Sequence, residues 1–186
     1  MSAPGTDLLS AFPAFYELPP SSAPSSSDED TWYLLAQIKE NMTLTKPTLI
    51  VTDRKGVDFA VTFDDALDLK ARGFRKGRTL VAPRATREDR EEGKKAIVRI
   101  GRGCAGDVKV IPGGLEQVSE LAFLLAGSDG LGQKCAACGA TEGSLSKCTG
   151  CATAAYCSKD CQVKGWSELG HKSNCKVIRS IRDIWG

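Results

Sequence analysis

The middle of the chain alternates hydrophobic and polar residues as a strand with one buried face does. Val57, Phe59, Val61 and Phe63 alternate with small or polar residues, which places their side chains on one face of an extended segment. A β-branched run at residues 48–52 precedes them, and residues 53–56 between the two runs have the composition of a hairpin turn. Further patterns predict strands at residues 32–39, 78–82, 96–100 and 108–111, and a short helix from Asp64 or Asp65 to about residue 70.

Six short strands with a small helix after the third predict a compact barrel-like domain at residues 31–127. This order resembles an oligonucleotide/oligosaccharide-binding (OB) barrel. From Leu115 to Leu125 the apolar spacing becomes helical, so the domain is expected to end in a helix that Gly127 can terminate. Gly130 and Gly132 then mark residues 128–134 as a linker. The predicted fold class is therefore α+β, with a small OB-like domain followed by a second, smaller module.

Residues 1–30 differ from the rest of the chain in charge and composition. They carry five acidic and no basic residues, and serine and proline are frequent. So little apolar surface cannot offset the entropy of ordering, which predicts a disordered acidic tail. Two interpretations are open for its few apolar residues, a short partner-binding segment or weak packing on the chain's own domain. These residues are Leu8, Leu9, Phe12, Phe15, Tyr16 and Leu18.

Seven of the eight cysteines and the only histidine lie close to the carboxyl end. They form four pairs with the spacings Cys-x2-Cys, Cys-x2-Cys, Cys-x3-Cys and His-x3-Cys, each short enough to close on one ion. Structural zinc takes four such ligands and leaves no position for water or substrate, so eight ligands predict two filled structural zinc sites. The ligands in order are Cys135, Cys138, Cys148, Cys151, Cys157, Cys161, His171 and Cys175.

A disulfide framework is the alternative interpretation of clustered cysteines. The first basic residue is Lys39, which is not typical of a signal or transit peptide, and no apolar run approaches the roughly 18 residues that span a membrane. A histidine at ligand spacing also has no role in a disulfide set. We therefore expect a reduced protein of the cytoplasm and/or nucleus, without a membrane partner.

Residues 135–175 resemble a MYND-type zinc finger, both in all eight ligands and in the accompanying Tyr156, Gln162, Trp166 and Lys172. The one small departure is the spacing of four residues between Trp166 and His171. The resemblance implies cross-braced coordination by two ligand sets. Cys135, Cys138, Cys157 and Cys161 would hold one zinc ion, and Cys148, Cys151, His171 and Cys175 the other.

The resemblance also implies function, because MYND fingers are interaction modules that dock short proline-containing peptides in transcriptional or signalling proteins. Gln162 and Trp166 are four residues apart and would share one face of a helix, where they could form the peptide groove. The alternative is that Trp166 packs over the second zinc site. After Cys175, residues 176–186 predict an amphipathic helix whose apolar stripe packs on the module or contacts a partner.

These features predict a non-enzymatic adaptor. A RING finger would place its histidine near the middle of the ligand series, which disfavours a ubiquitin ligase, and a SET methyltransferase needs a larger catalytic domain than the roughly 100 residues before the finger. The alternative function is nucleic-acid binding, with the zinc finger purely structural. It would use the basic run from Lys70 to Arg87 on the OB-like domain and Phe74 as a stacking aromatic, although such runs are more often solvated loops.

Overall fold

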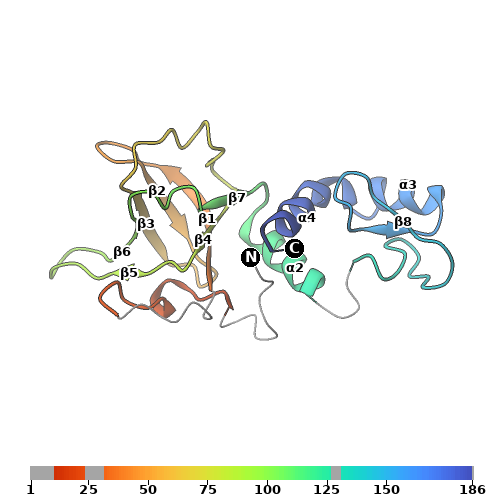
Figure 1. The fold of residues 1–186 in the computed structure, drawn as a ribbon, viewed down its shortest axis with the longest axis horizontal. Helices are drawn as coiled ribbons and strands as arrows, with labels where there is room; N and C mark the ends of the chain where they lie inside the picture. The colour runs from red at the N-terminus through yellow and green to blue at the C-terminus, as the bar shows by residue number, and fades with distance from the viewer. Residues whose placement is uncertain (1–10, 24–31, 127–130, 186) are drawn as a thin grey trace. The chain divides into compact units, whose positions relative to one another are not determined.

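The computed structural model describes residues 11–23, 32–126 and 131–185. These residues cluster into two compact units, a sheet unit that ends at Glu116 and a C-terminal unit that begins at Gln117. The fold class is α+β, with one large sheet and, in the described residues, three helices (Figure 1). No helix in the described part of the chain is both long and apolar enough to cross a membrane.

The sheet unit contains seven strands in the order β5-β6-β3-β2-β1-β4-β7. Neighbouring strands are antiparallel, except that β3 and β6 run parallel. Strands β5 and β7 form its two edges and no described strand pair joins them, so the sheet does not close and the OB-like barrel stays a prediction. The strands are β1 (Tyr33–Asn41), β2 (Thr48–Thr52), β3 (Asp58–Phe63), β4 (Thr79–Pro83), β5 (Arg87–Glu88), β6 (Ile97–Ile100) and β7 (Lys109–Ile111).

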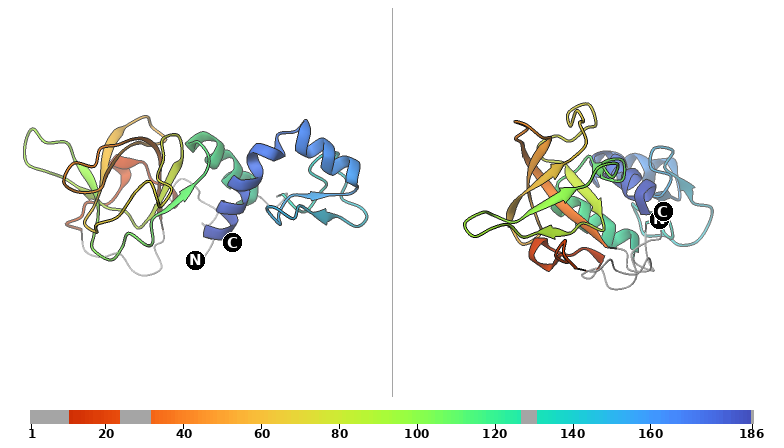
Figure 2. Two further views of the ribbon diagram at one scale, coloured as in Figure 1. Left: turned by 90° about the horizontal axis from the view of Figure 1, so that it is seen from above. Right: turned by 60° about the vertical axis from the view of Figure 1, so that its left-hand side comes forward.

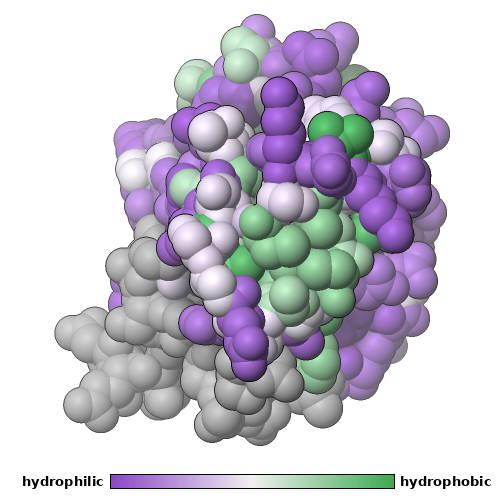
Figure 3. Space-filling view, turned by 90° about the vertical axis from the view of Figure 1, so that its right-hand side faces the viewer, coloured by the Kyte–Doolittle hydropathy of each residue, from purple (hydrophilic) through white to green (hydrophobic). Residues whose placement is uncertain are grey.

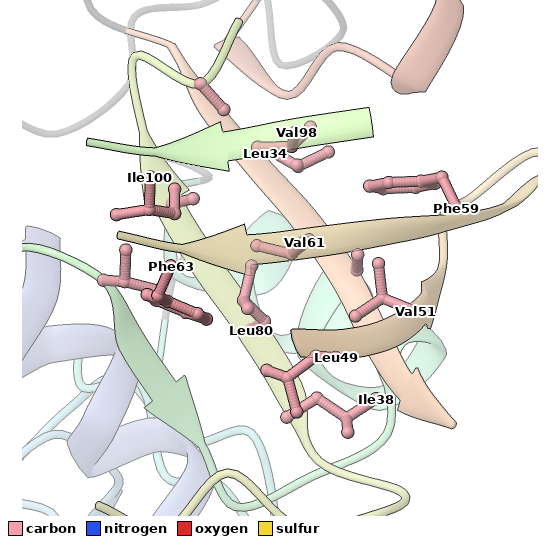
Figure 4. Close-up of a cluster of buried hydrophobic side chains, with 14 of the residues drawn as sticks. Leu34, Ile38, Leu49, Val51, Phe59, Val61, Phe63, Leu80, Val98 and Ile100 are labelled. Atoms are coloured by element: carbon pink, nitrogen blue, oxygen red, sulfur yellow. The ribbon is translucent and has the colours of Figure 1, made fainter. Parts of the chain in front are cut away.

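The core of the sheet unit lies on the face that the alternating pattern predicts. Phe59, Val61 and Phe63 from β3 are at most 4 % exposed, and they meet Leu49 and Val51 from β2 (Figure 4). The turn between β2 and β3 also follows the prediction. The amide of Gly56 donates to the Asp53 carbonyl oxygen at 3.0 Å, and Gly56 has a positive φ of 76°.

The predicted helix at residues 64–70 is wrong. Both aspartates are held elsewhere, because Asp64 pairs with Arg99 from β6 at 2.9 Å and Asp65 accepts from the amide of Gly103. A tight turn forms instead a few residues later, where the Asp68 carboxylate accepts from the amides of Lys70 and Ala71. The sequence signal for a helix cap was therefore present but belonged to a turn.

The expectation of a disordered tail is wrong for residues 11–23, while residues 1–10 and 24–30 lie outside the described ones. Around the short 3-10 helix η1 (Phe15–Glu17), the segment lies against the sheet (Figure 2). The Phe15 ring is 2 % exposed and stacks on Phe59 with 4.2 Å between centroids. Of the two interpretations of its apolar residues, packing on the chain's own domain describes Phe15 and Leu18, which are both buried.

Polar contacts hold the same segment in place. The buried Asp53 carboxylate accepts from the amide of Phe15 at 2.8 Å, and Glu17 forms ion pairs with Arg54 and Lys55 at 2.6 Å each. Arg87 donates from its side chain to the Tyr16 carbonyl oxygen. Composition did not reveal this order because the partners lie 37 or more residues away in the sequence.

The C-terminal unit combines helices with a small two-stranded sheet. Helices α2 and α4 lie side by side (Figures 1 and 2), and the side-chain Nε2 of Gln117 donates to the Asn174 side-chain oxygen at 2.7 Å. The apolar stripe of α4 is buried at Val177, Ile178 and Ile181, as expected for packing within the unit. The elements are α2 (Leu115–Ala126), β8 (Ser146–Lys147), β9 (Ala155–Tyr156), α3 (Lys159–Ser167) and α4 (His171–Trp185).

Two boundaries differ from the sequence-based division. The chain divides at Glu116, so nearly all of α2 clusters with the C-terminal unit rather than with the sheet. Helix α4 is also continuous from His171, so residues 176–185 extend the last segment of the finger rather than forming a separate helix.

Candidate metal centres

Two tight turns carry the Cys-x2-Cys pairs. In the first, the amide of Gly139 donates to the Cys135 carbonyl oxygen at 2.8 Å. In the second, the amide of Ala152 donates to the Cys148 carbonyl oxygen at 2.7 Å. Both closing residues have positive φ, 78° for Gly139 and 56° for Ala152. The two turns therefore have matching backbone geometry, although only one uses the residue that adopts it without strain.

Strand β9 anchors both turns. The carbonyl oxygen of Ala154, just before β9, accepts from the amide of Cys148 at 2.7 Å, and that of Ala155 accepts from the amide of Ala136 at 2.8 Å. Ala154 and Ala155 are fully buried, so the small side chains allow this close approach. One short strand thus fixes the spacing of the two cysteine turns.

The other two ligand pairs lie at the starts of helices. Ser158 caps α3 by accepting from the amide of Cys161 at 3.1 Å, which brings Cys161 beside Cys157. His171 and Cys175 are four residues apart in the first turns of α4 and therefore share one face. The start of α3 also favours the Cys161 thiolate electrostatically, because this cysteine lies in the first turn of the helix.

The structure gathers the eight ligands into two sets. Within each set the ligand atoms all lie within 4.8 Å of one another. The sets are Cys135, Cys138, Cys157 and Cys161, and Cys148, Cys151, His171 and Cys175, which are the sets implied by the resemblance.

The distances fit zinc. A tetrahedral ion 2.3 Å from each sulfur places neighbouring sulfurs about 3.8 Å apart. In the first set the Cys157 sulfur lies 3.6 Å from those of Cys138 and Cys161. In the second, the sulfurs of Cys148 and Cys175 are 3.8 Å apart. These cysteines are free thiols rather than disulfides, and the two clusters fit two structural zinc ions.

The electrostatics of the clusters also favour a bound cation. Burial acts to raise the pKa of Cys135, but hydrogen bonds from the backbone of Cys157 and Cys138 outweigh it and bring the pKa to about 6. The neighbouring Cys161 and Cys138 thiols raise the pKa of Cys157 to about 12. Four thiols this close cannot all ionise without a positive charge between them, and zinc supplies that charge.

The second cluster is the more deeply buried one. All four of its ligands are buried, whereas in the first cluster only Cys135 is. Burial lowers the pKa of His171, which keeps its imidazole neutral as a metal ligand must be. The Nε2 atom of this ring lies 3.8 Å from the Cys151 sulfur.

Two aromatic rings contact the edges of the His171 imidazole. Tyr156 is fully buried, and its ring centroid lies 5.9 Å from that of His171. The ring centroid of Trp166, from α3, lies 5.8 Å from that of His171. Trp166 thus contacts a ligand of the second site and still remains 43 % exposed, and its role in a peptide groove stays a prediction. Gln162 is also exposed and lies one helical turn earlier on α3.

Several residues around the clusters were not found from the sequence. A side chain at Gly150 would approach the Cys175 sulfur to 2.8 Å, and one at Gly165 would lie 2.5 Å from the Tyr156 ring. The Arg182 guanidinium donates to the Cys151 carbonyl oxygen at 2.6 Å, tying the far part of α4 to the second turn. Of these three residues, only Gly150 could have been singled out from the sequence, because it lies between the two cysteines of a Cys-x2-Cys pair.

The stacking aromatic of the alternative function is not available. Phe74 is 2 % exposed and packs edge-on against Phe63 in the core, 5.7 Å between centroids. A buried ring cannot stack on a base, so the prediction for this residue is wrong.

The C-terminal unit thus holds a cross-braced module with two zinc sites, each built from one cysteine turn and one helix start. Residues 135–175 match the family model described as the MYND finger. This segment is a MYND finger, which in general is a zinc-binding protein-interaction domain. A comparison of the chain with curated proteins gave no match.

Proposed function

We propose that the chain is a non-enzymatic adaptor whose MYND finger docks a short proline-containing peptide of a partner protein against helix α3. The observation that carries the proposal is the exposure of Gln162 and Trp166 on one face of α3, where Trp166 also contacts the His171 ligand of the second site. An indole ring beside an amide can pack on a proline ring and bond to the peptide backbone.

The surroundings of Trp166 support an interface. Val163 is 57 % exposed and Leu169 49 % exposed, so α3 and the residues just after it leave three large apolar side chains in solvent. On the face of the molecule seen in Figure 3, a hydrophobic area and smaller hydrophobic spots lie among polar residues. Exposed apolar surface with a polar rim is typical of protein interaction sites.

The zinc chemistry supports an adaptor rather than an enzyme. Each cluster supplies four protein ligands, which would occupy all four positions around a tetrahedral zinc ion. No coordination position would remain for a substrate or an activated water. The free thiols that zinc requires favour a cytoplasmic or nuclear setting, where transcriptional or signalling partners would be met.

A peptide titration of the full chain tests this proposal. A library of short proline-containing peptides is titrated by fluorescence polarisation, and the best binder is then measured against Gln162→Ala and Trp166→Phe. Both variants should lose at least about tenfold in affinity. Phe123→Ala removes an exposed aromatic elsewhere in the same unit and serves as the matched control.

Metal analysis separates binding from folding in this experiment. Gln162 has an exposed side chain with no described contact, so its variant should keep two zinc equivalents. The proposal fails if no peptide binds the wild-type chain, or if Gln162→Ala and Trp166→Phe bind as well as Phe123→Ala does.

A further inference from the structure

An open hollow in the sheet unit gathers positive charge. It has a volume of about 590 Å³ and is lined by the end of β1, at Lys39, Glu40 and Asn41, and by a loop between β3 and β4. The loop contributes Lys70, Arg75 and Lys76, and Phe74 also borders the hollow. The volume is in the range of small-ligand sites.

The loop is held firmly in this position. Phe74 is its anchor, buried in the core, and the amide of Phe74 donates to the Leu69 carbonyl oxygen at 2.9 Å. The amide of Gly77 donates to the Ile38 carbonyl oxygen at 2.8 Å, and Ile38 in turn donates to Arg78. Two backbone hydrogen bonds thus join the loop to β1 at Ile38, the residue before Lys39. These bonds fix the positions of the two sides of the hollow relative to each other.

The charges in the hollow are not balanced. Among the described residues, no carboxylate pairs with Lys70, Arg75 or Lys76, and Glu40 is the only acidic residue of the lining. Lys39 is the exception among the cations, because it pairs with Asp58 at 2.7 Å. The three unpaired cations repel one another, because the loop holds them around one hollow. A multiply charged anion bound there would relieve that repulsion.

We propose that this hollow binds a ligand with clustered phosphate groups, either a free polyphosphate compound or the phosphorylated headgroup of a lipid. Phosphates fit because a guanidinium and two ammonium groups can each donate to a different phosphate oxygen. Nucleic acid is less favoured, because no exposed aromatic lines the hollow to stack a base.

The connection after β1 can distinguish the two sources. Asn41 lines the hollow, and the residues that follow it place Met42 at 47 % and Leu44 at 88 % exposure. An apolar loop tip next to a basic hollow suits insertion at the surface of an anionic membrane. Binding to a lipid headgroup should therefore depend on Leu44, whereas binding to a free polyphosphate should not.

The test measures three probes with the full chain at physiological ionic strength. The probes are tripolyphosphate, phosphatidylcholine vesicles that contain a bisphosphorylated phosphoinositide, and a short single-stranded DNA. The double variant Arg75→Ala, Lys76→Ala should lose at least about tenfold in affinity for the preferred phosphate probe, since it removes two charge-assisted contacts. Arg102→Ala removes an exposed cation elsewhere in the same unit and should keep the affinity.

Each outcome decides the proposal. Tripolyphosphate binding that the double variant loses supports the free compound, and vesicle binding that both the double variant and Leu44→Ser lose supports the lipid. Lys70→Ala repeats the measurement should the double variant misfold. The proposal is overturned if neither phosphate probe binds, if Arg102→Ala loses as much affinity as the double variant, or if the DNA binds more tightly than both.

Discussion

Replacing Phe15 by alanine tests whether the segment at residues 11–23 is part of the sheet unit. The ring is 2 % exposed and stacks on Phe59 with an interplanar angle of 14°. Removing a buried phenylalanine ring costs about 3–5 kcal/mol. We expect the lower end, about 3 kcal/mol, because the segment lies at the surface of the unit and can close part of the cavity.

Hydrogen exchange read by mass spectrometry reports this loss for the sheet unit alone. A loss of about 3 kcal/mol should speed the slowest amide exchange in β3 by about a hundredfold. Tyr16→Ala is the matched control, because that ring is 67 % exposed and makes a cation–π contact with Arg87 and an edge contact with Phe15, 5.1 Å between centroids. Each contact is worth about 0.5–1 kcal/mol, so the control should lose less stability than Phe15→Ala. Equal, small effects of the two substitutions would refute the packing of this segment.

Three further predictions concern the metal, the packing of α3 and pH. Chelation of zinc, or Cys148→Ser, should abolish the tertiary near-ultraviolet spectrum of the finger, because a structural zinc ion supplies about 10–16 kcal/mol; a retained spectrum would contradict this. Gly165→Ala should lower the melting temperature, since a methyl group 2.5 Å from the buried tyrosine ring costs about 1–3 kcal/mol, more than the gain of up to about 1 kcal/mol in helix propensity; a rise would contradict the packing. A hydrogen bond from Lys55, helped by the backbone of Ala14, lowers the pKa of Glu17 from 4.5 to about 2. Its contribution to stability should be complete above pH 4.5 and disappear as the pH falls towards 2, so wild type and Glu17→Gln should converge in urea unfolding at low pH; a constant difference would argue against the ion pairs.

Local patterns in the sequence predicted much of the sheet and of the zinc ligands. A buried strand such as β3 shows its inner face as every second residue, and the pattern needs no knowledge of distant partners. The ligand spacings are equally local, since a Cys-x2-Cys turn closes on an ion by itself. Their division into two sets came from the resemblance to a family rather than from the spacing.

Contacts between distant residues account for what the sequence did not predict. Residues 64–70 have the composition of a helix start, but Asp64 is bound by Arg99, 35 residues later. The segment around Phe15 looks too polar to order, yet its partners Asp53 and Phe59 provide a ready surface. Nothing in the sequence marks Gly165 as special. The nearby Tyr156 ring explains why this position of the helix has no side chain.

The alternation of the two ligand sets along the chain affects how the finger takes up metal. Filling the first site joins residues 135 and 161, and both cysteines of the second turn lie inside that closed loop. Much of the chain entropy that the second site must overcome is then already lost, so the second ion binds to a partly organised cage. Zinc supply should therefore switch the finger between an empty and a doubly loaded form, and singly loaded chains should be scarce.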